Sequence, residues 1–228
     1  MTNNPQFQRP SFQFKGRKSP LAITVAILVA IGVLFTALSG FYADWLWFKS
    51  VNFTNTWSTI LTTKATLFLV SGLLTSVIVI FNVLLAYKRR PLYVPMTVEA
   101  DNLERYRSQV EPIRRPLIIG LSVALFYFAG TAGSQMWSTW LLFKNSTSFG
   151  VTDPQFNMDV SFFAFRLPFW QTLISWGIST AILAILASVA VHYLYGGIRL
   201  QVQQDRTTVA ARVQLSVLLG LVVLLKAV

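Results

Sequence analysis

Two side chains in this sequence could carry a charge or a proton inside an apolar stretch. His192 is the single histidine, and it lies near one end of an apolar run, among aromatic neighbours and without a carboxylate in that run. A lone intramembrane histidine can relay protons, but this position favours a structural role. Lys226 lies in the last apolar run, where its charge either faces a polar pathway or reaches the nearer interface on its long stem. Its shallow depth favours a structural or packing role.

Composition excludes most catalytic chemistry. The chain has no cysteine, which excludes disulfides, thiolate metal sites and cysteine nucleophiles, and one histidine cannot build a multi-histidine metal site. No acidic residue lies inside an apolar run, and no Ser/His/Asp set or glycine-rich phosphate loop is present. We therefore expect no catalytic, cofactor-binding or metal-binding residues and no enzymatic activity.

The overall composition indicates a membrane protein. Of 228 residues, 54% are hydrophobic and only 12% are charged, which is too apolar for an ordinary soluble domain. The net charge of +11 suggests nucleic acid at first. The basic residues flank apolar runs and form no separate basic domain, so we expect no nucleic-acid binding.

Five apolar runs predict an all-α, polytopic transmembrane helical bundle. They cover residues 20–42, 66–87, 116–136, 169–195 and 213–228. The first run is longer than the ~7–15 apolar residues of a cleavable signal, so we interpret it as an uncleaved anchor. Small residues four apart in the second run, Ser71/Thr75 and Gly72/Ser76, predict close approach of a neighbouring helix. Because the fifth run reaches the last residue without a polar flank, we expect an N-terminal part of a longer protein.

The basic residues predict the orientation of these spans. Seven of the nineteen lie in residues 87–116, between the second and third runs, and fourteen lie in segments predicted to be inside against four outside. The positive-inside rule then places the N-terminus, with a polar tail over residues 1–19, in the cytoplasm. Within the basic loop, four prolines should break the chain around a short surface helix over residues 97–110. Its alternating acids and arginines predict a solvated, partly self-paired face.

The predicted outer side is rich in aromatic residues. Phe41–Phe48 and Trp137–Trp140 have the composition of interfacial belts. Residues 153–167 carry apolar side chains at helical spacing, which predicts an interfacial amphipathic helix before the fourth span, with Asp159 as N-cap of its second half. The distinctive residues of this outer-interface motif are Asp153, Pro154, Phe156, Asp159, Phe162 and Phe163.

Three stretches carry a family resemblance: DWLWF (residues 44–48), RRPLYVP (89–95) and DPQFNMDVSFFAFRLPF (153–169). With them the chain resembles the N-terminal part of the UPF0182 family of large bacterial, mainly actinobacterial, integral membrane proteins. The resemblance implies further spans and a large extracytoplasmic region. It carries over no catalytic residue, since the family has no settled activity. Asn157 stands where family members often have glycine, which implies a looser local turn.

The leading functional interpretation is a non-enzymatic module of the cell membrane. It would anchor or scaffold a large extracytoplasmic domain in a cell-envelope complex, with the lipid bilayer and other envelope proteins as partners. The alternative is a transporter or channel for a lipid or small solute. That function needs polar groups along a pathway, and only serines, threonines, His192 and Lys226 are available in the apolar runs. A membrane-embedded enzyme has the least support.

Overall fold

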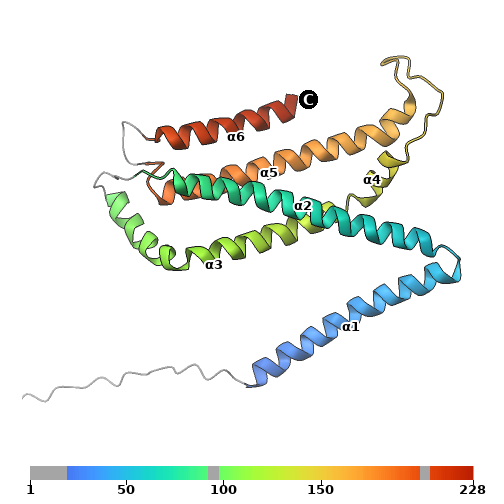
Figure 1. Ribbon diagram of the computed structural model, residues 1–228, viewed down its shortest axis with the longest axis horizontal. Helices are drawn as coiled ribbons and strands as arrows, with labels where there is room; N and C mark the ends of the chain where they lie inside the picture. Colours follow the sequence, from blue (N-terminus) through green and yellow to red (C-terminus); the bar gives the residue numbers. More distant parts are fainter. Residues whose placement is uncertain (1–19, 92–97, 201–205, 228) are drawn as a thin grey trace, which may run out of the picture. The chain divides into compact units, whose positions relative to one another are not determined.

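A computed structural model describes residues 20–91, 98–200 and 206–227, and its long elements there are helices (Figure 1). They are α1 (Pro20–Ser50), α2 (Thr54–Lys88), α3 (Val98–Ser134), α4 (Trp137–Lys144), α5 (Leu167–Leu194) and α6 (Val209–Ala227). All except α4 are long and apolar enough to cross a membrane. The predicted all-α transmembrane fold is therefore confirmed, and a multi-pass membrane protein is indicated. The predicted tail over residues 1–19 and residues 92–97 of the basic loop lie outside the described residues.

The chain divides into two compact units, Met1–Ser58 and Thr59–Val228. In the first unit, α1 continues eight residues past its predicted end and includes the aromatic stretch. Rings gather at this end of the helix: Phe41 meets Trp57 edge-on, with ring centroids 5.0 Å apart, and Lys49 lies 4.9 Å over the ring of Trp45. The turn into α2 passes through Asn52 at φ 61°, a left-handed conformation that asparagine tolerates.

Helix α3 combines two elements that the sequence separates. It joins the surface helix predicted over residues 97–110 to the third span, with Pro112 and Pro116 in its interior. The expectation that these prolines break the segment is wrong. Each proline removes one backbone donor and crowds the preceding turn, which bends a helix when the turns on both sides remain bonded. Figure 1 shows the resulting change of direction in the first third of α3.

In the second unit, α2 and α3 approach closely through small residues, as predicted. Gly72 has no room for a side chain, because an added Cβ would lie 2.6 Å from the carbonyl oxygen of Phe126. Two hydroxyls bridge the helices: Ser71 Oγ donates to the carbonyl of Ala129 at 3.0 Å, and Ser76 Oγ donates to that of Ser122 at 3.1 Å. Such contacts suit membrane helices, whose association gains little from burying apolar surface.

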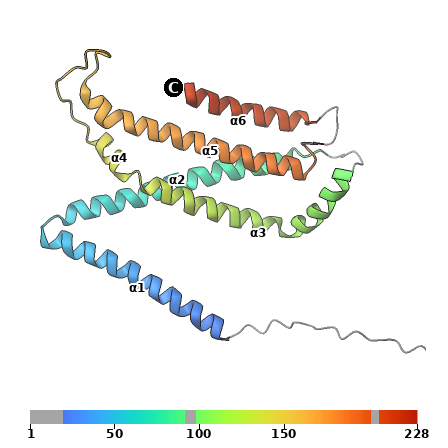
Figure 2. The same ribbon diagram turned by 180° about the vertical axis from the view of Figure 1, so that it is seen from behind.

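Helices α5 and α6 lie side by side and run in opposite directions (Figures 1 and 2). Their contact includes a small apolar core of Val79 from α2, Ala184 from α5 and Leu218 from α6. This core joins α2, α5 and α6.

The predicted interfacial helix over residues 153–167 is wrong in its first half. Residues 153–158 form a turn, closed by an antiparallel bridge between Thr152 and Asp159. The chain becomes helical at Val160 and continues through a π-helical turn, η1 (Phe162–Arg166), directly into α5. The reason is local: Asp153 Oδ1 accepts the backbone N–H of Gln155 and of Phe156, both at 2.9 Å, and this competes with helix formation. We call residues 146–161 the Asp159 loop.

Asn157 is one of two residues of this loop with a left-handed backbone, and the other is Gly150. The φ of Asn157 is 52°, and its N–H donates to the carbonyl of Asp153 at 2.9 Å. Asparagine is one of the few side chains that tolerate this region. The turn is closed with asparagine in place, and the looser turn that the family resemblance implies stays a prediction.

Candidate functional site

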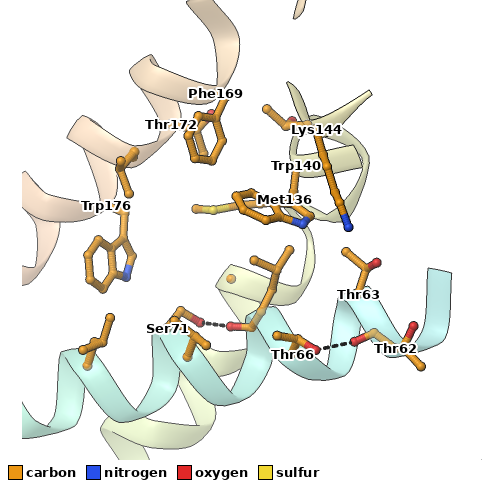
Figure 3. Close-up of a pocket in the computed structure, with 16 residues that line it drawn as sticks. Thr62, Thr63, Thr66, Ser71, Met136, Trp140, Lys144, Phe169, Thr172 and Trp176 are labelled. Carbon is orange, nitrogen blue, oxygen red and sulfur yellow. Dashed lines mark hydrogen bonds between the residues drawn. The ribbon is translucent and has the colours of Figure 1, made fainter. Parts of the chain in front are cut away.

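One candidate site is a cavity of about 500 Å³ between α2, the end of α3, α4 and the start of α5 (Figure 3). We call it the α2–α5 cavity. Its walls are mostly apolar and include Leu67, Val70, Leu74, Met136 and Leu173. Concave apolar sites with few polar groups are the usual form of ligand pockets.

Rigid aromatic contacts hold one wall of this cavity in place. Phe143 of α4 stacks on Phe169 of α5 with centroids 4.1 Å apart, and Trp140 meets the same ring at 5.5 Å. These rings fix α4 against α5, while the close approach of Gly133 to Ser71 fixes α3 against α2. The cavity lies between the α4–α5 pair and the α2–α3 pair, and the packing within each pair fixes its walls.

Polar groups gather at the end of the cavity where α2 begins. Thr62, Thr63 and Thr66 lie on α2, and Lys144 ends α4 opposite them (Figure 3). The hydroxyl of Thr66 donates to the carbonyl of Thr62 at 2.8 Å, which leaves its oxygen able to accept. Lys144 forms no ion pair within the part of the chain that the structure describes. This end of the cavity is thus cationic.

Trp176 places a buried donor in the cavity wall. Its Nε1 has no hydrogen-bond partner among the described residues, and Figure 3 shows the indole nitrogen facing the cavity. A buried donor left unpaired costs about 1–3 kcal/mol. The cavity can therefore bind a molecule that is apolar along its length and carries a hydrogen-bond acceptor and a negative charge.

A second polar site lies in the helix core and contains His192, which is 1% exposed. His192 Nε2 lies 3.0 Å from Gln214 Oε1, and Gln214 Nε2 donates to the backbone oxygen of Asn82 at 3.0 Å and to Ser188 Oγ at 3.1 Å. Because the amide nitrogen faces a carbonyl, the amide oxygen faces the histidine, and His192 must donate from Nε2. The cluster joins α2, α5 and α6, and the structural role of His192 remains a prediction.

Lys226 lies apart from this cluster. It is exposed near the end of α6, twelve residues beyond Gln214, or about 18 Å along the helix axis. The structure therefore does not join the two intramembrane residues that the sequence singled out.

At the opposite end of the bundle from the α2–α5 cavity, a carboxylate joins three helices. Glu111 of α3 accepts from the hydroxyl of Tyr87 at 2.8 Å, from that of Tyr195 at 2.7 Å and from Arg114 at 3.2 Å. Burial and the bond to Glu111 raise the pKa of Tyr195 to about 12. Arg107 Nε donates to the carbonyl of Leu194 at 2.7 Å, at the end of α5. The expected self-pairing of acids and arginines is present here.

The outer-interface motif folds around its two aspartates. Asp159 accepts hydrogen bonds from the Ser148 hydroxyl, from Gly150 N at 3.0 Å and from Ser161 N at 2.8 Å. These bonds, that of Ser148 first, hold the pKa of Asp159 well below its usual range. The motif's rings lie together: the centroids of Phe156 and Phe163 are 5.7 Å apart, and those of Phe162 and Phe163 are 5.5 Å apart. Pro154 lies in the turn that Asp153 closes.

Sequence reasoning missed the cavity and most of the buried cluster. Gln214 could have been found, since it is an amide inside an apolar run. Trp176 and Lys144 had no such signal, because a tryptophan and a lysine near span ends are common interfacial residues.

The matches to known proteins all point to one family. The family described as Uncharacterised protein family (UPF0182) matches residues 21–228. A UPF0182 protein of Streptomyces coelicolor is 42% identical over 93% of this chain, and one of Salinispora tropica is 44% identical over 90%. The matched part is 21% of each relative, so the chain spans about a fifth of their length. A UPF0182 protein of Thermobifida fusca is 42% identical over 92% of the chain. No solved structure matches.

Proposed function

This chain belongs to the uncharacterised protein family UPF0182, and from that premise we propose that it is a membrane module that anchors and positions the extracytoplasmic part of a larger envelope protein. Its N-terminus lies in the cytoplasm, and the Asp159 loop lies outside. The module acts by binding, with other envelope proteins and lipid as partners, and performs no catalysis.

The observation that carries this proposal is an exposed apolar surface on an ordered loop. Phe149, Val151 and Phe156 of the Asp159 loop are 51%, 60% and 59% exposed. The carboxylates of Asp153 and Asp159 fix the backbone beneath them. Exposed apolar side chains on a rigid support are typical of a protein-binding surface. This surface is suited to hold the adjoining extracytoplasmic region.

The test uses the complete protein with Phe149→Ser and Phe156→Ser together. We expect normal amounts in the membrane but faster limited proteolysis of the extracytoplasmic region, because its support is lost. The matched control is Phe53→Ser, which changes a phenylalanine that is 60% exposed outside the loop. Equal proteolysis of all three proteins would refute the anchoring role.

The proposed orientation has its own test. Reporter fusions after Arg105 should read cytoplasmic, and fusions after Ser148 should read external. The reverse pattern at either position would overturn the topology.

Transport of a lipid or small solute is the second candidate, and the α2–α5 cavity is the observation that favours it. A transporter must hold its substrate inside the membrane, and this cavity offers an apolar space with a cationic end. Proteoliposomes of the complete protein should then move a labelled lipid between leaflets. If the protein anchors normally but moves no lipid, lipid transport is excluded and the anchoring proposal still stands.

A further inference from the structure

We propose that the face of α5 covered by α2 and α6 is a proton path. His192 binds the proton, and a layer of apolar side chains closes the way from His192 to the α2–α5 cavity. The path requires neither the anchoring role nor lipid transport, since it involves no extracytoplasmic partner and no bound lipid.

Side chains with a polar group recur at every fourth residue along α5, with Ala184 as the exception. They follow one line of the helix from the cavity to its last turn: Thr172, Trp176, Thr180, Ser188 and His192. Residues four apart lie on one face of an α-helix. The first two line the cavity, and the other three are 4%, 0% and 1% exposed. The buried face of this span is therefore polar on both sides of Ala184.

Helices α2 and α6 add polar groups to the same face. Thr75 of α2 meets Thr180 at 3.4 Å between the hydroxyl oxygens. Gln214 of α6 donates to Ser188 Oγ at 3.1 Å and to the backbone oxygen of Asn82 at 3.0 Å. Small residues are enough to pack membrane helices together. An ionisable ring bonded to an amide in the same core exceeds that need, and intramembrane ionisable groups mark ion and proton pathways.

One apolar layer interrupts this polar face. Val79, Ala184 and Leu218 meet between Thr180 and Ser188, and none is more than 7% exposed. Thr180 and Ser188 are eight residues apart, or about 12 Å along the helix axis. The lining of the cavity reaches to one helical turn before Thr180. Because a dry apolar constriction holds no chain of water molecules, this layer is the gate.

The surroundings of His192 favour the uptake of a proton. It lies in the last turn of α5, where the helix dipole favours a positive charge. Its Nε2 donates to Gln214, so the neutral ring keeps its lone pair at Nδ1. Nδ1 lies against Gly197, where an added Cβ would be 2.8 Å away. The accepting nitrogen therefore faces the turn that leaves the helix, and no side chain of residue 197 covers it.

Proton transfer through the ring uses both nitrogens. A proton from water at the turn binds Nδ1 and converts the ring to an imidazolium. When water enters the apolar layer, the Nε2 proton passes to that water, and a neutral ring with its proton on Nδ1 remains. Exchange through water then returns the proton to Nε2. Imidazole is suited to both steps because it takes up and releases protons near neutral pH.

The charges around this face favour a proton over a metal cation. Helices α2, α5 and α6 contain no carboxylate. Glu111 of α3 lies at the inner end, where its carboxylate is bonded to Tyr87, Tyr195 and Arg114. Arg199, in the turn after α5, donates to the carbonyl of Gly196 at 3.2 Å. The basic side chains of α2 and α6 are exposed: Lys64, Lys88, Arg212 and Lys226.

The experiment measures proton uptake into proteoliposomes of the complete protein, with a pH-sensitive dye inside and a potassium diffusion potential as the driving force. We expect wild-type vesicles to take up protons faster than protein-free vesicles. Ala184→Ser continues the polar line through the apolar layer and should raise the rate severalfold. His192→Gln keeps a polar side chain beside Gln214 but binds no proton. It should lower the rate to that of protein-free vesicles, alone and in the Ala184→Ser protein. Gly197→Ala, which crowds Nδ1, should slow uptake severalfold.

Matched controls separate the path from a general leak. Ala190→Ser places the same hydroxyl on the exposed face of α5, and Gly220→Ala adds a methyl where nothing lies within 4 Å. Neither should change the rate. If Ala184→Ser takes up protons no faster than Ala190→Ser, the apolar layer closes no path and the proposal is wrong. Uptake that persists when His192→Gln is added to Ala184→Ser would overturn it as well, because the proton would then bypass the histidine.

Discussion

Gln214 accepts a hydrogen bond from His192 Nε2 at 3.0 Å while its amide nitrogen donates to Asn82 and Ser188. One amide therefore pairs polar groups from two other helices where water has little access. Gln214 is 5% exposed and Ser188 is fully buried.

Gln214→Leu should destabilise the protein by about 1–3 kcal/mol, because it leaves His192 as an unpaired buried donor. Replacing both residues, in His192→Leu with Gln214→Leu, should cost less than the two single changes added together. Unfolding in detergent mixtures measures these differences. Val217→Ala on the exposed face of α6 is the control. If the stability losses of the His192→Leu and Gln214→Leu single variants add up to that of the double variant, the two residues are not paired.

Gly72→Ala should weaken the contact between α2 and α3. Its Cβ would lie 2.6 Å from the backbone oxygen of Phe126, which cannot rotate away, so the helices must separate at a cost of about 1–3 kcal/mol. Gly120→Ala is the matched control, since nothing lies within 4 Å of the Cβ there. A thermal unfolding midpoint for Gly72→Ala as high as that of Gly120→Ala would rule out this close contact.

Tyr195 should make stability depend on alkaline pH. Its pKa is raised from 10.0 to about 12, so the folded state holds the phenolic proton more tightly than the unfolded state. The resulting stabilisation is fully present below about pH 10 and is lost as the pH rises toward 12. Tyr195→Phe should remove this dependence and cost about 1–2 kcal/mol at neutral pH, because it breaks the bond to the Glu111 carboxylate.

Ultraviolet titration of tyrosinate, compared with unfolding at each pH, provides the measurement. Tyr193→Phe is the control on the same turn. An unchanged stability slope in Tyr195→Phe between pH 10 and 12 would show that another group is responsible.

Asp159→Asn should loosen the Asp159 loop without unfolding the helices. The carboxylate accepts the backbone N–H groups of Phe149 and Gly150, and a neutral amide accepts them less strongly. Because the pKa of Asp159 lies below its usual range, this support is present above the ordinary aspartate pKa of about 3.9 and is lost as the pH falls further.

Hydrogen exchange at the amides of Phe149 and Gly150 should accelerate severalfold in this variant. Asp44→Asn, an exposed aspartate on α1, should leave both rates unchanged. Protection that persists in Asp159→Asn would mean that backbone bonds alone hold the loop.

The sequence predicted the five long apolar helices because hydropathy is a local property. Residues 169–195 differ from α5 by only a residue or two at each end, whereas α2 begins at Thr54, twelve residues before the predicted run over residues 66–87. The helix over residues 153–167 failed because the spacing of Phe156 and Phe163 is helical, whereas Asp153 bonds its own backbone and closes a turn first. Hydrophobic periodicity shows which residues would share a face of a helix. It does not show whether a side chain such as Asp153 will bond the backbone and form a turn instead of a helix.

The α2–α5 cavity lay beyond sequence reasoning for a different reason. Trp176, Lys144 and Thr62 belong to three helices, α5, α4 and α2, and α4 is held against α5 by packing such as that of Phe143 on Phe169. An unpaired donor is likewise a property of the assembled bundle, since each tryptophan in the sequence has the same indole N–H.

The contacts between α2 and α5 are unevenly distributed along their length. Thr75 and Thr180 meet at 3.4 Å, and Tyr87 and Tyr195 meet at 5.1 Å between ring centroids. From Thr75 back to Thr62 the cavity separates the two helices. From Thr75 inward the two helices therefore contact each other directly, whereas around the cavity their spacing depends on α4, whose Phe143 stacks on Phe169 of α5.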